Sequence, residues 1–196
     1  MRICLDLDST IFDFVPLYKQ AFKGTQYQYY HPYRWNVYEC YPKSLADMLM
    51  RIFTSPAIFH TSLLDNRIPA VVNALIFNSK YDVRVITARN VKHSGEKHKL
   101  QTSEEMQEET FKQLQRAKIY LPKEKITVTG HSKLEEFQKQ RIDLVFDDSP
   151  HIIEECLAND IDSVMISNET TPYNHYLRNR VMWKESLVDA IKQKQL

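Results

Sequence analysis

Two aspartates two positions apart follow a short apolar run at the start of the chain. Asp6 and Asp8 come directly after Ile3–Leu5, and the hydroxyl residues Ser9 and Thr10 follow them. If the run is a strand that continues through both aspartates, alternation points the two carboxylates to the same side. Two negative charges at such a short separation repel each other, so the pair needs a cation or a shared proton. An Asx or Ser/Thr turn at the strand end is the alternative interpretation.

Three later apolar runs are also followed by polar side chains. The runs and the groups after them are Val83–Ile86 with Thr87 and Arg89, Ile126–Val128 with Lys133, and Leu144–Phe146 with Asp147 and Asp148. Each group alone has a structural explanation, such as a strand end, a solvated lysine or a helix cap. Arg89 could orient a site carboxylate, contact substrate or form a structural ion pair. Their joint placement after successive strands favours a functional site.

The residue types suit one reaction. Carboxylate oxygens at this density suit Mg²⁺, which would offset their repulsion and neutralise phosphate charge. One carboxylate can attack phosphorus, and a second can protonate the leaving oxygen and then accept a proton from water. Lys133 and the Thr87 hydroxyl can hold the non-bridging phosphoryl oxygens. The residues therefore predict Mg²⁺-dependent hydrolysis of a phosphate ester.

Segments with helical periodicity separate several of these apolar runs, and Ser163–Ile166 is a fifth run. Strands that alternate with helices imply a parallel sheet with right-handed crossovers and helices on both faces. We therefore expect an α/β fold, a Rossmann-like three-layer parallel sheet, whose strand carboxyl ends meet at the ligand-binding edge. Residues 92–125 are expected to be a solvated helix and loop, and residues 183–194 a short amphipathic helix.

The first crossover is far longer than one helix needs, with about seventy residues between Leu5 and Val83. Within it we expect helices over 12–23 and 44–54, a Tyr/Trp-rich loop over 25–41, a return over 55–66 and a helix that begins near Pro69. We predict that residues 1–13 and 78–196 form the core domain. Residues 14–77 are then a small helical cap subdomain inserted after the first strand.

The loop of the expected cap is rich in aromatic residues. They are Tyr27, Tyr29, Tyr30, Tyr33, Trp35 and Tyr38. They could form a surface on which a base stacks. They could equally be the packing of a small subdomain that lacks a larger core. The sequence leaves both interpretations open.

Composition limits the classes of protein to consider. The 196 residues are 43% hydrophobic, and 26 Lys and Arg nearly balance 25 Asp and Glu, for a net charge of +1. This balance gives no electrostatic reason to bind a nucleic-acid backbone or a membrane surface. Three dispersed cysteines without a CxxC pair suggest a reducing compartment, and no apolar run is long enough to span a membrane. We expect a cytoplasmic protein.

The segments DLDST, VITAR, the Lys133 segment and VFDD occur in this order after successive predicted strands. Together they resemble the four motifs of the haloacid dehalogenase-like phosphohydrolase superfamily. The resemblance implies that Asp6 is the nucleophile and Asp8 the general acid/base. It also implies that Mg²⁺ is held by Asp6, the Asp8 main-chain carbonyl and the Asp147–Asp148 pair. Of that pair we favour Asp148 as the direct ligand.

A closer similarity is to the 5'(3')-deoxyribonucleotidase family. The first motif continues as IFDF, the helix led by Pro69 follows the cap and precedes the Thr87 strand, and VFDDSP and a closing Trp-containing helix at Trp183-Lys184 also match. The similarity implies that Phe14 lies beside a nucleobase and Lys92 near the phosphate. Two features depart from that family. Ser9 replaces its usual glycine, and the stretch 90–109 is longer and more polar.

We therefore expect a phosphoric monoester hydrolase that forms an aspartyl-phosphate and acts on nucleoside monophosphates, in particular deoxyribonucleotides. The expected substrate-binding residues are Phe14, Thr87, Arg89, Lys92 and Lys133. One alternative substrate is another small phosphomonoester or a 3'-phosphorylated nucleic-acid end. A different alternative is a non-catalytic module that senses a nucleotide. The preferred base, the sugar, the position of the phosphate and a possible homodimer stay open.

Overall fold

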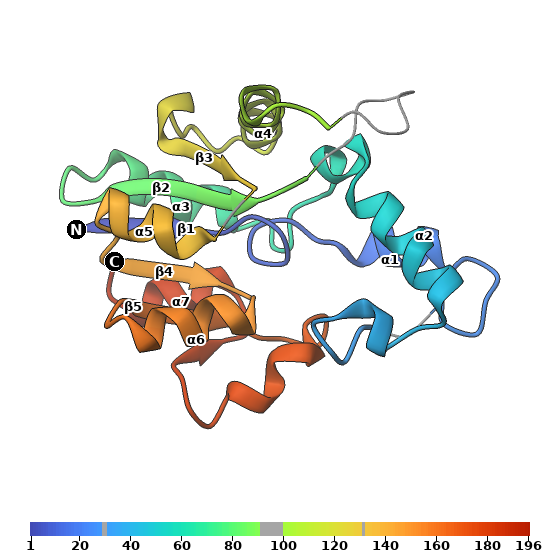
Figure 1. The fold of residues 1–196 in the computed structure, drawn as a ribbon. Helices are drawn as coiled ribbons and strands as arrows, with labels where there is room; N and C mark the ends of the chain where they lie inside the picture. Colours follow the sequence, from blue (N-terminus) through green and yellow to red (C-terminus); the bar gives the residue numbers. More distant parts are fainter. Residues whose placement is uncertain (29–30, 91–99, 131) are drawn as a thin grey trace.

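Parallel strands form the centre of the computed structural model, which describes residues 1–28, 31–90, 100–130 and 132–196 (Figure 1). Within these residues, one six-stranded sheet has the order β3-β2-β1-β4-β5-β6, with every pair parallel. The strands are β1 Arg2–Leu5, β2 Asp82–Ala88, β3 Ile126–Thr129, β4 Leu144–Asp147, β5 Asp162–Ile166 and β6 Trp183–Lys184. All five strands predicted from the apolar runs are confirmed.

Helices cover both faces of the sheet. The α-helices are α1 Val15–Ala21, α2 Lys43–Phe53, α3 Ile68–Phe77, α4 Ser103–Arg116, α5 Lys133–Gln140, α6 Pro150–Ala158 and α7 Leu187–Gln193. Short 3₁₀ turns are η1 Val37–Glu39, η2 Pro56–His60, η3 Lys123–Lys125 and η4 Pro172–Leu177. Figure 1 shows α5 and α6 on one side of the sheet and α3 and α7 on the other. None of the described helices is both long and apolar enough to cross a membrane.

Alternation along β1 explains why the fold has three layers. Ile3 and Leu5 belong to the large hydrophobic cluster on the face covered by α3 and α7, whereas Cys4 belongs to a separate cluster with Phe137 and Cys156 on the α5–α6 face. Side chains at successive positions of a strand point to opposite faces. A central strand must therefore be apolar at its buried positions, as Ile3, Cys4 and Leu5 are here. The predicted three-layer α/β fold is confirmed.

Two expected helices are shorter in the structure. The expected helix 12–23 is reduced to α1, because the Asp13 carboxylate accepts a hydrogen bond from the Val15 N–H at 2.8 Å and so forms a turn before the helix begins. The expected helix 183–194 starts as β6, because the Ser167 N–H donates to the Lys184 carbonyl at 2.8 Å and extends the sheet. The helix α7 then begins after Ser186, whose hydroxyl caps it.

The helices α1 and α2 lie beyond the carboxyl ends of the strands (Figure 1). They have a small hydrophobic cluster of their own, which includes Tyr18, Phe22 and Leu49. Phe14 and Phe53 pack against both this cluster and the main one. By contrast, α3 packs against α7 and β2. The division at 14–77 stays a prediction, while α1 and α2 form a helical layer over the edge of the sheet where ligands are expected.

Candidate active site

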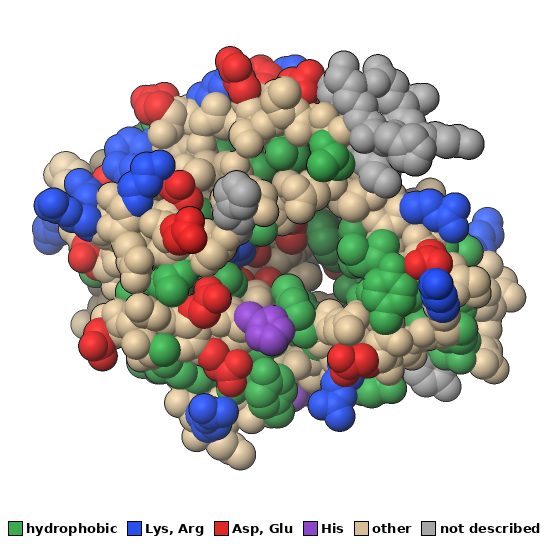
Figure 2. Space-filling model, in the orientation of Figure 1, with side chains coloured by type: hydrophobic (Ala, Val, Ile, Leu, Met, Phe, Trp, Pro, Cys, Tyr) green, Lys and Arg blue, Asp and Glu red, His purple; other side chains and the backbone are tan. Residues whose placement is uncertain are grey.

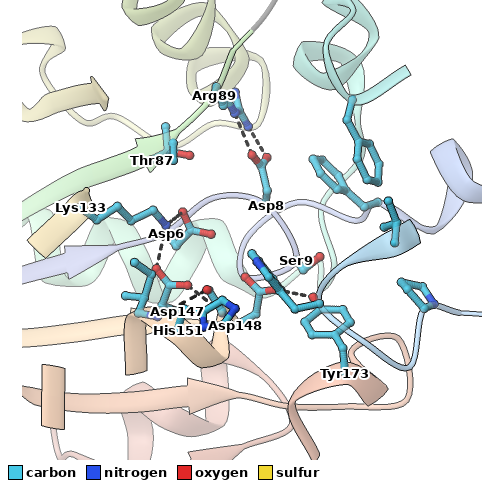
Figure 3. A pocket seen from close by; sticks show the side chains of 18 of the residues that line it. Asp6, Asp8, Ser9, Thr87, Arg89, Lys133, Asp147, Asp148, His151 and Tyr173 are labelled. Carbon is cyan, nitrogen blue, oxygen red and sulfur yellow. Dashed lines mark hydrogen bonds and ion pairs between the residues drawn. The ribbon is translucent and has the colours of Figure 1, made fainter. Parts of the chain in front are cut away.

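The loop after β1 separates the two aspartates of the first motif. The strand ends at Leu5, and the Leu7 carbonyl accepts hydrogen bonds from the N–H groups of Ile11 and Phe12, both at 2.8 Å. The condition under which alternation would align Asp6 and Asp8 is therefore not met. Figure 3 shows Asp6 turned toward Lys133 and Asp8 toward Arg89.

Ser9 follows these aspartates with a φ of 61°. This is the left-handed region, in which a side chain is disfavoured and glycine is favoured. The turn itself thus supplies a reason for glycine at this position, and this chain accommodates serine there instead.

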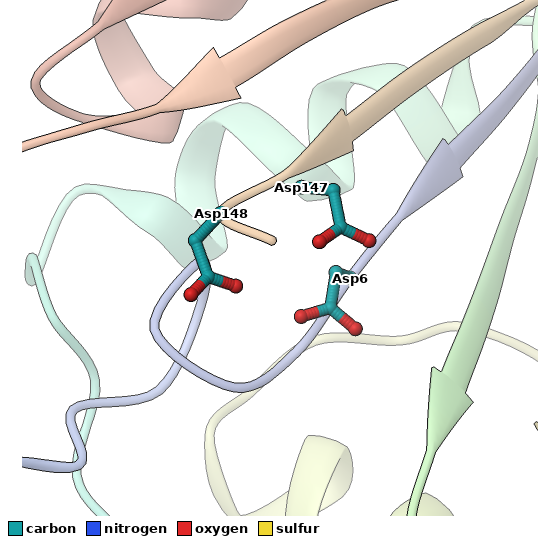
Figure 4. A group of neighbouring side chains, drawn as sticks. All are labelled: Asp6, Asp147 and Asp148. Atoms are coloured by element: carbon teal, nitrogen blue, oxygen red, sulfur yellow. The ribbon is translucent and has the colours of Figure 1, made fainter. Parts of the chain in front are cut away.

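Three buried carboxylates form an acidic cluster at the carboxyl ends of β1 and β4 (Figure 4). Asp6, Asp147 and Asp148 each offer an oxygen within 4.8 Å of the others. Lys133, at the first position of α5, donates from Nζ to Asp6 Oδ1 at 2.6 Å and to Asp147 Oδ2 at 2.8 Å. The structure thus brings together, from the ends of β1 and β4 and the start of α5, four side chains that the sequence predicted to share a site.

Burial makes the charge of this cluster unfavourable. The pKa of Asp6 is raised to about 7, mainly by burial and also by the charges of Asp147 and Asp8, against the opposing effect of Lys133. Burial likewise raises the pKa of Asp148 well above its ordinary value, with Asp147 adding to the effect. Burial alone would lower the pKa of Lys133, yet Asp147 and Asp6 hold it above its ordinary value. Three ionised carboxylates and one ammonium leave two negative charges, which a divalent cation would neutralise.

The donor set of the cluster fits Mg²⁺. Its oxygens are hard ligands, come from the carboxyl ends of two neighbouring strands and lie within 4.8 Å of one another. Asp147 Oδ1 accepts the Ser149 N–H at 2.8 Å and its Oδ2 accepts Lys133. Asp148 Oδ2 accepts the Tyr173 hydroxyl, and among the described residues no donor is recorded for Asp148 Oδ1. Of the two residues Asp147 and Asp148, Asp148 therefore has the oxygen that is better placed to bind a cation directly.

Tyr173 and Asn174 were missed by the sequence analysis. Both lie on η4, which follows β5, and the Asn174 side-chain amide donates to the Asp148 carbonyl at 2.7 Å and to the Ile166 carbonyl at 2.9 Å. The Asn174 amide thus holds the main chain of Asp148, and the Tyr173 hydroxyl holds its side chain. Polar residues that follow a predicted strand were the signal that identified the other site residues. This signal was applied to four predicted strands but not to the fifth, which precedes Tyr173 and Asn174.

Thr87 lies at the end of β2, within the same cavity as the acidic cluster. Its hydroxyl oxygen is buried and has no hydrogen-bond partner in the described part of the chain. A buried polar atom without a partner is costly and calls for an explanation such as a bound ligand. The position and chemistry of this hydroxyl suit an oxygen of a bound phosphoryl group.

Arg89 follows β2 and lies against Asp8 rather than free in the cavity. Its Nε donates to Asp8 Oδ2 at 2.9 Å, and its NH2 group donates to Asp8 Oδ1. The guanidinium is buried, whereas one fifth of the Asp8 side chain, 20%, remains exposed. Asp8 is thus held on both oxygens and still lines the cavity.

A cavity of about 720 Å³ lies between the sheet edge and the helices α1 and α2. Figure 2 shows the hollow, with acidic side chains at its floor and hydrophobic ones along its wall. The wall on the side of α1 and α2 includes Phe14, Tyr18 and Phe53. The rings of Phe14 and Phe53 stack with centroids 5.2 Å apart, and Tyr18 meets Phe53 edge-on at 5.3 Å. The cavity therefore has a charged end and an aromatic end.

The aromatic loop divides between the two interpretations that the sequence left open. Tyr27 packs against Phe22 and Tyr41, with centroid distances of 6.5 and 5.8 Å, as part of the small cluster. Trp35 and Tyr38 line the cavity instead. The Trp35 ring meets Tyr173 edge-on at 5.3 Å and so crosses from the aromatic loop to the core. The residues Tyr29, Tyr30 and Lys92 lie outside the described residues.

Comparisons with known proteins identify the fold. No protein-family model and no curated protein matches the sequence. A haloacid dehalogenase-like family hydrolase from Streptococcus pneumoniae matches with a TM-score of 0.61 and 12% identity, over 98% of this chain and 97% of that chain. A HAD family hydrolase from Deinococcus radiodurans, solved with phosphate and sodium, gives 0.59 and 13% identity over 98% and 95%. A predicted phosphatase from Clostridium acetobutylicum gives 0.58 and 13% over 98% and 96%. The chain therefore has the fold of the haloacid dehalogenase-like hydrolases.

Proposed function

We propose that this protein is a Mg²⁺-dependent phosphomonoesterase that acts through an aspartyl-phosphate. The observation that carries the proposal is the buried cluster of Asp6, Asp147 and Asp148 around Lys133, at the floor of a cavity that also holds the unpartnered Thr87 hydroxyl. The solved structure from Deinococcus radiodurans, of the same fold, contains bound phosphate. Fold alone does not establish function, so the proposal depends on the site.

The proposed reaction has two steps. A carboxylate oxygen of Asp6 attacks phosphorus, the bond from phosphorus to the leaving oxygen breaks, and Asp8 supplies the proton to that oxygen. Asp8 then takes a proton from water as the water oxygen attacks phosphorus, and the bond to Asp6 breaks to release inorganic phosphate. Lys133 and Thr87 hold the non-bridging oxygens. Mg²⁺ would neutralise phosphoryl charge. The residues that would hold it are Asp6, the Asp8 main-chain carbonyl and Asp148, with Asp147 beside them.

We further propose that the substrate is a nucleoside monophosphate, in particular a deoxyribonucleotide. Among the described residues that line the cavity, the Lys and Arg side chains are Lys133 and Arg89, and Arg89 is occupied by Asp8. Lys133 is itself paired with Asp6 and Asp147, so a bound Mg²⁺ would have to supply the remaining positive charge that one phosphoryl group needs. The stacked rings of Phe14 and Phe53 offer a flat apolar surface to a base. The nitrogens of Arg89 are bound to Asp8, Thr110 and Gln113, so we do not assign it a direct contact with the substrate, while such a contact by Lys92 stays a prediction.

Two alternatives use the same cavity. Another small phosphomonoester or a 3'-phosphorylated nucleic-acid end keeps the chemistry but changes the leaving group, and the net charge of +1 disfavours the polynucleotide. A nucleotide sensor without turnover would keep the pocket and lose the reaction. A sensor has no need of Asp8 beside the phosphate, and this argues for the enzyme.

The experiment is a screen of phosphatase activity with the full chain. Nucleoside 5'- and 3'-monophosphates, sugar phosphates and an aryl phosphate are each incubated with Mg²⁺ or with EDTA. We expect release of inorganic phosphate from nucleotides with Mg²⁺, loss of it with EDTA, and loss of it in Asp6→Asn. Turnover that survives EDTA or Asp6→Asn would contradict the mechanism, and binding of nucleotide without any turnover would favour the sensor.

A further inference from the structure

The guanidinium of Arg89 is enclosed on every side by groups from different parts of the chain. Two of its nitrogens donate to the two oxygens of Asp8, as described above. The third, NH1, donates to Gln113 Oε1 at 2.9 Å and to Thr110 Oγ1 at 3.4 Å. The ring of Phe59 lies against the guanidinium, with Cζ 5.3 Å from the centroid. The side chain is thus held as a rigid fork aimed at one carboxylate.

Gln113 fixes the third nitrogen of that fork. Its side chain is buried on α4, 2% exposed, and both ends of the amide are used. The oxygen accepts from Arg89, and the nitrogen donates to the Ile58 carbonyl at 3.2 Å and to Thr61 Oγ1 at 3.1 Å. A turned amide would face its donor toward the Arg89 cation and its acceptor toward the Ile58 carbonyl, so Gln113 cannot turn without losing both of those bonds.

The acceptors of Gln113 belong to the segment on which the chain returns from α2 to the core. Ile58 lies on η2, and Thr61 follows it directly. Phe59, whose ring lies against Arg89, is on η2 as well. The orientation of Arg89 is therefore set by β2, α4 and η2 together.

We propose that Arg89 is a positioning residue for Asp8, and that Gln113 is the positioning residue that holds Arg89 in place. The inference rests on the proposed function, in which Asp8 protonates the leaving oxygen. A bidentate pair fixes the plane and direction of a carboxylate, and the exposed part of Asp8 faces the cavity. Arg89 thus acts through Asp8 by orienting its carboxylate toward the leaving oxygen. Gln113 acts through Arg89 by holding the guanidinium in the orientation that this requires.

The proposal makes the effect of Arg89 depend on the leaving group. An alkyl phosphate releases a basic alkoxide, so its loss from phosphorus needs a proton from Asp8. An aryl phosphate such as p-nitrophenyl phosphate releases a weakly basic phenolate, which leaves without one. The ratio kcat/KM reports the steps up to departure of the leaving group and not the later hydrolysis of the aspartyl-phosphate. A defect in aiming Asp8 therefore lowers kcat/KM for the alkyl ester selectively.

The experiment measures kcat/KM of the full chain with Mg²⁺ for glycerol phosphate and for p-nitrophenyl phosphate. The first variant is Arg89→Lys, which keeps the charge but not the fork. The second is Gln113→Met, which keeps the length of the side chain. Its matched control is Gln107→Met, because Gln107 lies on the same helix and donates to the carbonyls of Lys123 at 3.2 Å and Ile126 at 2.6 Å, away from Arg89.

We expect Arg89→Lys to lower kcat/KM for glycerol phosphate about tenfold or more, a part of the roughly 10²–10⁴-fold that a general acid contributes. The aryl ester should change less than about twofold. Gln113→Met should show the same selectivity in smaller measure, and Gln107→Met should show none. Equal losses on both esters, or no loss, would overturn the positioning role even if a variant is less stable. If the unaltered protein hydrolyses nucleoside monophosphates but not glycerol phosphate, a nucleoside monophosphate takes its place as the alkyl ester. If it hydrolyses no phosphate ester at all, the proposed function itself fails and the inference falls with it.

Discussion

The substitution Asp6→Asn is expected to stabilise the metal-free protein while it abolishes activity. Burial raises the pKa of Asp6 from 3.8 to about 7 in the folded state. Between these pH values the unfolded chain has released its proton and the folded chain still holds it, so the free energy of unfolding falls as the pH rises. The fall spans about three pH units and amounts to about 4 kcal/mol, at about 1.4 kcal/mol per unit. Asparagine mimics the protonated carboxyl and does not incur this loss.

The assay is urea unfolding followed by circular dichroism, in EDTA, near the lower and above the upper of those two pKa values. We expect the free energies of unfolding of the two proteins to agree at the lower pH. Above the upper pKa the variant should be more stable by up to about 4 kcal/mol. Mg²⁺ should then stabilise the unaltered protein and not the variant. A variant that is less stable in EDTA at the higher pH would refute the reasoning.

An aspartate with the opposite environment provides the control. Although burial alone would raise the pKa of Asp82, hydrogen bonds from Lys125 and Arg84 lower it below its ordinary value. A lowered pKa contributes stability above the unfolded value that is lost as the pH falls through the folded one. Asp82→Asn should therefore destabilise the protein at neutral pH, and the difference should shrink in acid.

Three further predictions follow from the cavity. Tyr173→Phe, which removes the donor to Asp148, should weaken Mg²⁺ binding about 10–100-fold in calorimetry, and unchanged affinity would contradict that role. Lys133→Met leaves buried carboxylates unpaired and should cost about 3–5 kcal/mol in urea unfolding with EDTA, where a loss below about 1 kcal/mol would be evidence against it. Phe14→Ala should lower kcat/KM for nucleotides more than for glycerol phosphate, and an equal effect on both would argue against base stacking.

The strands were predictable because their signal is local and strong. A central parallel strand is buried on both faces, so its sequence is a continuous apolar run, as in Ile3–Leu5. The short strand β6 was not predictable in this way. Trp183 and Lys184 join the sheet through backbone hydrogen bonds with β5, which their side-chain pattern does not record. The region 92–125 was expected to be solvated, yet α4 buries Thr110 and Gln113 against Arg89.

The members of the site were predictable, but their pairing was not. The rule that strand ends meet at one edge brought Asp6, Lys133 and Asp147 together correctly. It did not predict that Asp8 pairs with Arg89, because the turn after Leu7 redirects Asp8. Contacts made by side chains far apart in sequence depend on the packing of loops, and composition and spacing do not encode that packing.

The most direct test of the account is to trap the covalent intermediate. The full chain is mixed with Mg²⁺ and a hydrolysed nucleotide, quenched rapidly in acid, digested, and examined by peptide mass spectrometry. The account predicts one phosphoryl group on the peptide that contains Asp6, and none in Asp6→Asn. Turnover with no phosphoryl group on that peptide, or with the group on another residue, would contradict the account.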